Sequence, residues 1–217
     1  MLPPPVLERV GQLRLFFVEE LRTARRFLSA AGWKGHVDEL ELLELNEHST
    51  REDIEALAVR LGEQDAGLIS EAGLPAVADP GAQLVECAHV RGIEVVPMVG
   101  PSSLMLALMA SGLNGQCFAF TGYLPVKAPA RREAIAALER ASSRAGQTQI
   151  VIETPYRNDG LLADLLAVCH PATRLCIAAG ITCPDESIRT RTIAAWQQEV
   201  KHGFSIGKRP CVFLLLA

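Results

Sequence analysis

The stretch AGLISEAGLPAVADPG occupies residues 66–81. Its first four residues are a short apolar run that ends at Ser70, which predicts a strand over 66–70 that is buried in a sheet. The rest is rich in glycine and proline, which fix the path of a loop, and in small residues, which let a ligand approach the backbone. The residues that follow, 82–91, have the spacing of a helix, so strand, loop and helix succeed one another here.

The same succession recurs throughout the first half of the chain. Helical spacing at 20–31 ends near Gly32, and Thr50 with Asp53 provides a capping signal for the helix that follows it. Such alternation predicts a parallel sheet covered by helices on both faces. The predicted strands are 13–18, 40–45, 66–70, 93–96 and 117–121, and the predicted helices are 6–12, 20–31, 54–61, 82–91 and 102–111.

The regular alternation of strands and helices ends after Gly122, where a basic loop at 127–132 leads into an alanine-rich helix. Two late strands follow one another without a long predicted helix between them, which indicates a mixed sheet. We therefore expect two α/β domains, 1–121 and 122–217, with a cleft between them. The predicted elements of the second domain are strands 149–153, 174–178, 188–192 and 211–216 and a helix at 159–168.

The composition excludes several classes of protein. The chain has 217 residues, of which 49% are hydrophobic and 21% are charged, which excludes a disordered or collagen-like chain. A net charge of −4 gives no broad cationic field for nucleic acid, so any RNA must be held by a local patch. The six cysteines form no C-x-x-C pair, which favours free thiols over a metal site and suits a reducing cytoplasm. Neither a signal peptide nor a membrane-spanning run is expected.

Generic fingerprints for dinucleotides, nucleoside triphosphates, zinc proteases and serine hydrolases do not occur. In a parallel sheet, however, ligands bind beyond the carboxyl ends of the strands. Three loops occupy such places, at 70–81, 97–103 and 121–125. We expect these loops to converge on one cleft.

The loops, taken together, resemble the tetrapyrrole methylase superfamily. The matching runs are 67–81, 95–103 and 122–125, together with 19–22, 46–48 and 153–157, so the likeness covers nearly the whole chain in order. Within the superfamily, the chain is most similar to the ribose 2'-O-methyltransferases of small-subunit ribosomal RNA.

The resemblance implies a homodimeric two-domain enzyme that binds S-adenosylmethionine in the cleft. No metal and no membrane is implied. It assigns to the cofactor Ser70, Gly73, Pro75, Asp79, Ser102, Ser103, Thr121, Gly122, Tyr123, Ala178 and Ala179.

The chain departs from the pattern in three places. Family members open with a strand and a glycine-rich loop that forms one wall of the cofactor site, whereas this chain begins after that loop. Where the ribosomal branch usually has an acidic residue and a lysine, this chain has the stretch AGITCPDE at 179–186, and the chain ends at Ala217 without the small additional domain. We expect a related but distinct subfamily, and either the start of this sequence lies downstream of the protein's true start or the protein lacks part of the pocket.

Methyl transfer to a ribose hydroxyl requires a base that takes up the proton. The candidates at or just after predicted strand ends are Glu19, Glu20, Glu71 and His48. The candidates for contact with the substrate are Arg22, Lys127, Arg131, Arg132, Tyr156 and Arg157.

Three alternatives stay open beside an RNA methyltransferase. The first is a methylase of the same fold that acts on a small molecule such as a tetrapyrrole. The second is a catalytically silent dimeric protein that binds S-adenosylmethionine. The third is an unrelated nucleotide-binding module, against which the absence of a phosphate fingerprint speaks.

Overall fold

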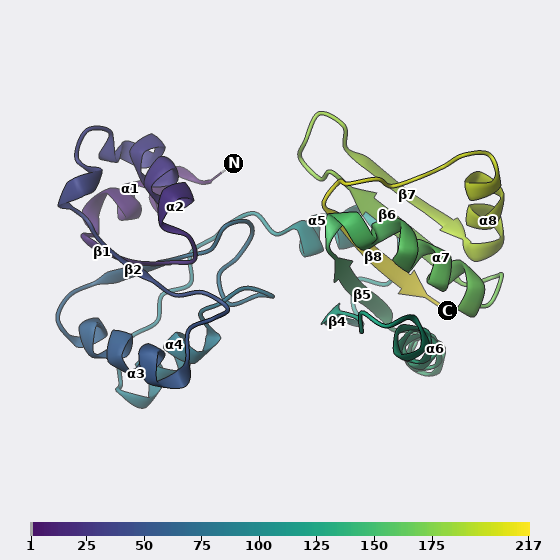
Figure 1. Cartoon of the computed structure of the whole chain (residues 1–217), viewed down its shortest axis with the longest axis horizontal. Coiled ribbons are helices and arrows are strands. Elements are labelled where there is room, and N and C mark those ends of the chain that lie inside the picture. Colours follow the sequence, from purple (N-terminus) through teal and green to yellow (C-terminus); the bar gives the residue numbers. More distant parts are fainter. Residues whose placement is uncertain (1) are drawn as a thin grey trace. The chain divides into compact units, whose positions relative to one another are not determined.

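The computed structural model describes residues 2–217 and divides the chain after Ser102 into two units, each built on its own sheet (Figure 1). This division lies earlier than the boundary predicted near Gly122. The reason is β4 (Phe118–Tyr123), which pairs in parallel with β5 (Thr148–Glu153) and therefore belongs to the second sheet. The sequence of β4 does not itself show whether this strand pairs with the strands before it or with β5 after it.

The first unit contains a parallel sheet with the strand order β2-β1-β3. The central strand alternates between two cores, because successive side chains of a strand point to opposite faces. Phe16 and Val18 pack with helices α1 and α2, and Phe17 packs with α3 and α4. The predicted parallel sheet with helices on both faces is thus confirmed. The elements are α1 (Pro4–Gln12), β1 (Leu15–Val18), α2 (Leu21–Leu28), η1 (Ser29–Trp33), η2 (Val37–Glu39), β2 (Glu41–Glu44), α3 (Arg51–Val59), η3 (Arg60–Gly62), β3 (Ala66–Ile69) and α4 (Ala82–Val90).

The strand predicted at 93–96 does not form. This segment has no regular secondary structure, and Val96 exposes 62% of its surface. Its apolar, β-branched residues favour an extended chain, but a strand also needs a hydrogen-bonded neighbour, and none of the described strands pairs with it.

The second unit holds a mixed sheet with the strand order β4-β5-β8-β6-β7, as expected for this half of the chain. Its central strand β8 lies antiparallel to both of its neighbours and is buried at all six residues. Helices α6, α7 and α8 cover one face, where Trp196 and Phe213 are buried, and α5 covers the other. The elements are α5 (Ser103–Ser111), α6 (Ala128–Ala145), η4 (Pro155–Arg157), α7 (Asn158–Val168), β6 (Arg174–Ala179), β7 (Ser187–Thr192), α8 (Ile193–Lys201) and β8 (Cys211–Leu216).

Helix α8 was not predicted. Its signals are present in the sequence, because the Thr192 hydroxyl accepts a hydrogen bond from the Ala195 amide at 3.2 Å, as an N-cap does. The helix also buries Ile193 and Trp196. Within residues 2–217, every helix falls short of the length and apolarity needed to cross a bilayer.

Candidate functional site

Two predicted bases lie at the carboxyl edge of the first sheet. β1 and β3 run in parallel, with Val18 opposite Ile69. Glu19 and Glu71, which follow these two residues, therefore lie at the same edge of the sheet. The Glu71 amide donates a hydrogen bond to Oε2 of Glu19 at 3.1 Å. The Thr23 hydroxyl of α2 bonds to Oε1 of Glu71, so both strand ends and one helix meet at these carboxylates.

Glu20 has a structural role. Its carboxylate accepts hydrogen bonds from the amides of Arg22 at 2.9 Å and Thr23 at 2.7 Å, so it caps the start of α2. These bonds favour the charged form and lower the pKa of Glu20. The side chain of Arg22 is exposed in the first turn of the same helix.

Burial and mutual repulsion raise the pKa of two carboxyl groups at this edge. For Glu19, burial is the main cause; the bond from the Glu71 amide opposes it, and the negative charges of Asp79, Glu71 and Glu47 add to it. For Asp79, burial raises the pKa, the Ser70 hydroxyl opposes this effect, and Glu71 adds to it. Oγ of Ser70 is buried, and although it lies near enough to Asp79 to affect that carboxyl, its geometry satisfies no regular hydrogen bond. The edge is therefore strongly acidic and includes an unsatisfied hydroxyl.

The loop at 70–81 is held in an unusual backbone conformation. Ala76 and Ala78 have φ angles of 64° and 65°, in the left-handed region that favours glycine. A side chain in that region costs roughly 1 kcal/mol, so the surrounding structure imposes the shape of this loop. Gly73 has a φ of 94°, and a Cβ atom placed on it would meet no atom within 4 Å. Pro75 lies between Gly73 and the two strained alanines.

The second predicted loop packs on the first. A Cβ atom on Gly100 would lie 3.0 Å from Cδ2 of Leu74, so glycine permits the close approach of the two segments. Ser102 is the last residue of the first unit, and Ser103 begins α5 in the second. The structure thus brings the loops at 70–81 and 97–102 together.

His48 follows the end of β2 and lies on the surface. Both His48 and Glu47 have side chains that are 84% exposed, and Nε2 of His48 lies 3.7 Å from Oε1 of Glu47. The imidazole borders a shallow hollow of about 440 Å³ that is also lined by Asn46, Ser49 and Asp53.

The other predicted cofactor residues lie at one edge of the second sheet. Strands β4, β5 and β6 run in the same direction, since β5 and β6 both lie antiparallel to β8. Their carboxyl ends carry Tyr123, Glu153 and Ala179. Thr121 and Gly122 belong to the irregularity of β4, where Gly122 has a φ of 75°. Ala178 and Ala179 are buried in the cores, at the end of a strand that is paired on both sides.

Arg157 is engaged by a carboxylate that was not predicted. Oε1 of Glu153 lies 2.6 Å from Nη2 and 2.9 Å from Nε of Arg157, and it also accepts a bond from the Thr154 amide at 2.7 Å. The Glu153 side chain is fully buried, and its Oε2 has no partner. Tyr156, which lies between Glu153 and Arg157 in the sequence, is 73% exposed. In the sequence, this ion pair was indicated by the acidic residue Glu153 four positions before Arg157.

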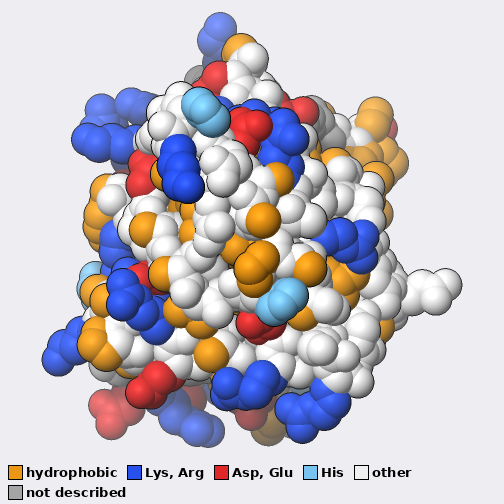
Figure 2. All heavy atoms as spheres, turned by 90° about the vertical axis from the view of Figure 1, so that its right-hand side faces the viewer, with side chains coloured by type: hydrophobic (Ala, Val, Ile, Leu, Met, Phe, Trp, Pro, Cys, Tyr) orange, Lys and Arg blue, Asp and Glu red, His pale blue; other side chains and the backbone are white. Residues whose placement is uncertain are grey.

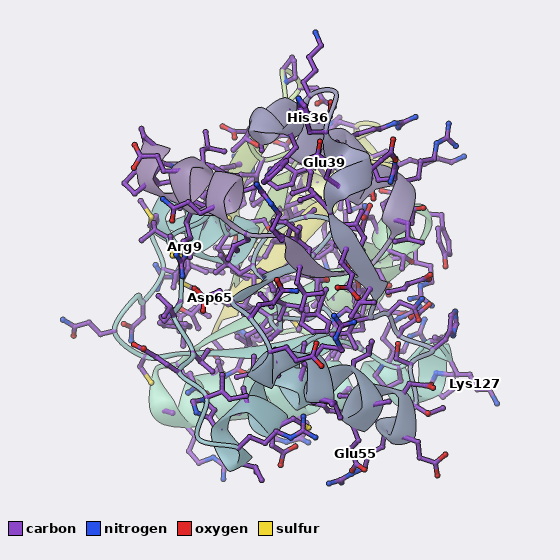
Figure 3. All side chains as sticks on the ribbon, turned by 90° about the vertical axis from the view of Figure 1, so that its left-hand side faces the viewer. Arg9, His36, Glu39, Glu55, Asp65 and Lys127 are labelled. Carbon is purple, nitrogen blue, oxygen red and sulfur yellow. The ribbon has the colours of Figure 1, made fainter. Side chains whose placement is uncertain are left out.

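The predicted basic loop is only partly a free cationic patch. Arg131 and Arg132 both bind Asp164 of α7, at 2.5 Å and 2.6 Å, and the side chain of Arg131 is 11% exposed. Burial raises the pKa of Asp164, but the hydrogen bonds from Arg132 and Arg131 outweigh it and lower the pKa. Arg131 is therefore part of the packing between α6 and α7. Lys127 is exposed and projects away from the ribbon (Figure 3).

No group of three or more His, Cys, Asp or Glu side chains within residues 2–217 is arranged to hold a metal ion. Each unit instead has one carboxyl edge that carries the predicted residues. That both edges face a common cleft stays a prediction.

Comparison with known proteins links this arrangement to a family. The chain is 33% identical over 213 residues to the ribosomal RNA small subunit methyltransferase I of Pseudomonas aeruginosa, a match that covers 98% of this chain and 72% of that protein. It is 34% identical to the protein of the same name from Neisseria meningitidis serogroup B, over 82% of this chain but only 58% of that protein. The chain thus spans little more than half the length of some of its relatives.

Solved structures agree in fold. Diphthine synthase superimposes with a TM-score of 0.65 at 14% identity, over 99% of this chain and 84% of that one. The uroporphyrin III C-methyl transferase from Thermus thermophilus gives a TM-score of 0.55 at 20% identity, over 99% and 90%. The family model of the tetrapyrrole (corrin/porphyrin) methylases matches residues 6–196. This chain is therefore a member of the tetrapyrrole methylase family.

Proposed function

We propose that this chain transfers a methyl group from S-adenosylmethionine to small-subunit ribosomal RNA, with a ribose 2'-hydroxyl as the acceptor. The observation that carries the proposal is the 33% identity to a small-subunit ribosomal RNA methyltransferase over 98% of this chain. The structures that share only the fold carry no weight for the substrate.

The first unit's edge fits the chemistry of the methyl donor. S-Adenosylmethionine carries its methyl group on a positively charged sulfonium, and Glu19, Glu71 and Asp79 concentrate negative charge there. The buried Ser70 hydroxyl lacks a regular hydrogen bond, and the space around Gly73 is open. The loop residues Ser70, Gly73, Pro75 and Asp79 would hold the donor, together with Ser102 and Ser103. In the second unit Tyr123 would do so, beside the strand end that carries Ala178 and Ala179.

Among the candidate bases, Glu19 is the best placed. Glu20 caps a helix, and the side chain of His48 is 84% exposed. The Glu19 carboxylate is held by the Glu71 amide and has a raised pKa, which suits a group that must accept a proton. Glu19 would take the proton of the ribose hydroxyl while the oxygen attacks the methyl carbon and the bond from that carbon to the sulfonium sulfur breaks, leaving a neutral thioether. Correct positioning of donor and acceptor contributes up to about 7–11 kcal/mol to such a transfer.

The test is a transfer assay with tritiated S-adenosylmethionine and purified small ribosomal subunits. We expect label in the RNA, located at a ribose by nuclease digestion and mass spectrometry. Glu19→Gln keeps the acceptor oxygen but not the basicity, so it should lower kcat strongly while calorimetry finds donor binding largely intact. Donor binding without any label in RNA would overturn the RNA substrate, and an absence of donor binding would overturn the methyltransferase assignment.

The proposal extends to assembly and location. A homodimer in the cytoplasm is consistent with a ribosomal substrate, and exposed apolar side chains such as Met109 (79% exposed) and Val99 (75%) offer surface for a second copy. Light scattering coupled to gel filtration measures the molar mass. A mass of one chain at micromolar concentration would overturn the dimer.

A further inference from the structure

The two units carry opposite charge. The first, up to Ser102, has 9 Lys and Arg against 17 Asp and Glu, which gives −8. The second has 12 against 8, which gives +4, and together they make up the −4 of the chain. Figure 2 shows Lys and Arg side chains widespread on the face that it draws. A polyanion such as RNA is therefore repelled by the first unit and attracted by the second.

Many cations of the second unit are already neutralised. Arg131 and Arg132 share Asp164, and Arg157 is paired with Glu153. Arg189 and Arg191 share Glu199 and lie over the ring of Trp196. These side chains serve the protein's own packing, so the cations available to a phosphate must be sought elsewhere.

Lys208 is exposed at the carboxyl edge of the second sheet. It lies three residues before Cys211, which opens β8 directly opposite Glu153 at the end of β5. The edge at which β4 and β5 end is thus the edge at which β8 begins. Lys127 leaves the end of β4 at the same edge, and Tyr123 and Tyr156 are 54% and 73% exposed there.

The turn that carries Lys208 is fastened to the first two residues of α7. The Asp159 carboxylate accepts bonds from the amides of Ile206 at 2.8 Å and Gly207 at 3.2 Å, and from the Ser205 hydroxyl at 3.0 Å. Nδ2 of Asn158 donates to the carbonyls of Gly207 at 3.3 Å and Arg209 at 2.7 Å.

The turn is also anchored from within. Ile206 is only 2% exposed, and Gly207 has a φ of 68°, in the left-handed region. The Arg209 guanidinium donates to the carbonyls of Ile206 at 3.0 Å and Asp185 at 3.2 Å. The backbone on both sides of Lys208 is therefore fixed, and fixing it in advance lowers the entropy lost when the ammonium group binds.

We propose that the turn Gly207–Arg209 is a contact site for the phosphate backbone of the substrate RNA, with Lys208 as the phosphate-binding side chain. The inference rests on the proposed function and deepens it. Lys127 adds a second cation along the edge, and the exposed ring of Tyr156, which has the Arg157 guanidinium 5.7 Å from its centre, offers a stacking surface for an unpaired base. A flexible loop would carry a lysine equally well, so the bonds from Asn158 and Asp159 indicate that its position matters.

The test compares Lys208→Glu with Arg144→Glu, which makes the same change of charge. Arg144 is exposed in the last turn of α6, a helix of 18 residues that begins next to Lys127, so it lies at the opposite end of that helix. The probe is small-subunit ribosomal RNA, with affinity measured by filter binding from about 0.05 to 0.2 M salt. Donor binding by calorimetry and the thermal unfolding midpoint are measured in parallel.

We expect Lys208→Glu to weaken RNA binding about tenfold or more, and Arg144→Glu to change it less than about twofold. Lys208→Gln should reduce the slope of log affinity against log salt by about 0.7–0.9, as one lost phosphate contact does. Donor affinity and the unfolding midpoint should stay as in the wild type.

Equal RNA affinities of the Lys208 and Arg144 variants, with a wild type that methylates RNA, would overturn the phosphate site and leave the proposed function intact. A wild type that binds the donor but neither binds nor methylates RNA would overturn the proposed function, and the phosphate site with it.

Discussion

The Glu71 amide donates to the Glu19 carboxylate at 3.1 Å and so joins the ends of two neighbouring parallel strands. The bond orients the Glu19 side chain and partly offsets the effect of its burial on its pKa. Asp79 and Glu47 add negative charge around the same group. An acidic group held in this way favours its protonated form more than a free glutamate does.

Glu19→Gln should therefore flatten the dependence of stability on pH. Because the pKa of Glu19 is raised in the folded protein, the folded state binds its proton more tightly than the unfolded state does. The free energy of unfolding therefore falls as the pH rises from the usual pKa of a glutamate through the raised pKa of Glu19. Glutamine does not titrate, so the variant lacks this pH-dependent contribution. Urea unfolding from about pH 4 to about pH 8 measures it. Glu8→Gln, an exposed position on α1, is the control, and a Glu19→Gln profile parallel to that of the wild type would contradict the expectation.

The strands could be predicted because burial marks them in the sequence. Phe16 and Phe17 lie in an apolar run that a sheet covered on both faces requires, and β8 repeats this pattern with six buried residues. What the local pattern lacks is the identity of the pairing partner. The boundary near Gly122 and the unformed strand at 93–96 both depend on which strands lie side by side.

The candidate site was predictable to a similar degree. Strand ends located Glu19, Glu71 and Tyr123, since parallel strands bring their carboxyl ends to one edge, whereas Ala179 was assigned by the resemblance. Arg131 could not be interpreted correctly, because its partner Asp164 lies 33 residues away on another helix. An ion pair of that kind forms only when the tertiary structure brings the two helices together.

Arg157→Ala should destabilise the second unit by about 3–5 kcal/mol, because it leaves the buried Glu153 carboxylate without its cation. The double variant Glu153→Gln with Arg157→Ala should recover a large part of this loss, since no charge is then buried. Chemical denaturation followed by circular dichroism measures both. Tyr156→Ala, at a 73% exposed neighbour, should have little effect. A double variant as unstable as Arg157→Ala would show that the charge is not the cause.

Asp164→Asn should destabilise the protein by about 3 kcal/mol, because Arg131 is 11% exposed and would lose its counter-ion. The pKa of Asp164 is lowered in the folded state, so its contribution is present above the usual pKa and is lost as the pH falls through the lowered one. The difference between wild type and variant should therefore shrink in acid. Arg132→Gln removes a 56% exposed partner and should cost less than about 1 kcal/mol. A difference that does not change with pH would contradict the assignment.

Glycine at position 76 should be tolerated or stabilising, whereas alanine at position 81 should not be. Ala76 has a φ of 64°, and Ala76→Gly relieves the strain of a side chain in the left-handed region, which offsets the entropy that glycine adds to the unfolded chain. Gly81 has a φ of 130°, and its Cβ atom would lie 2.6 Å from Cδ2 of Leu68, so Gly81→Ala adds strain and a clash. We expect Ala76→Gly to raise the free energy of unfolding by between zero and about 1 kcal/mol, and Gly81→Ala to lower it by about 1–3 kcal/mol. Ala72→Gly, in the same loop but without a positive φ, is the control and should lose about 0.5–1 kcal/mol. Equal losses for Ala76→Gly and Ala72→Gly in urea unfolding would show that the loop stores no strain at Ala76.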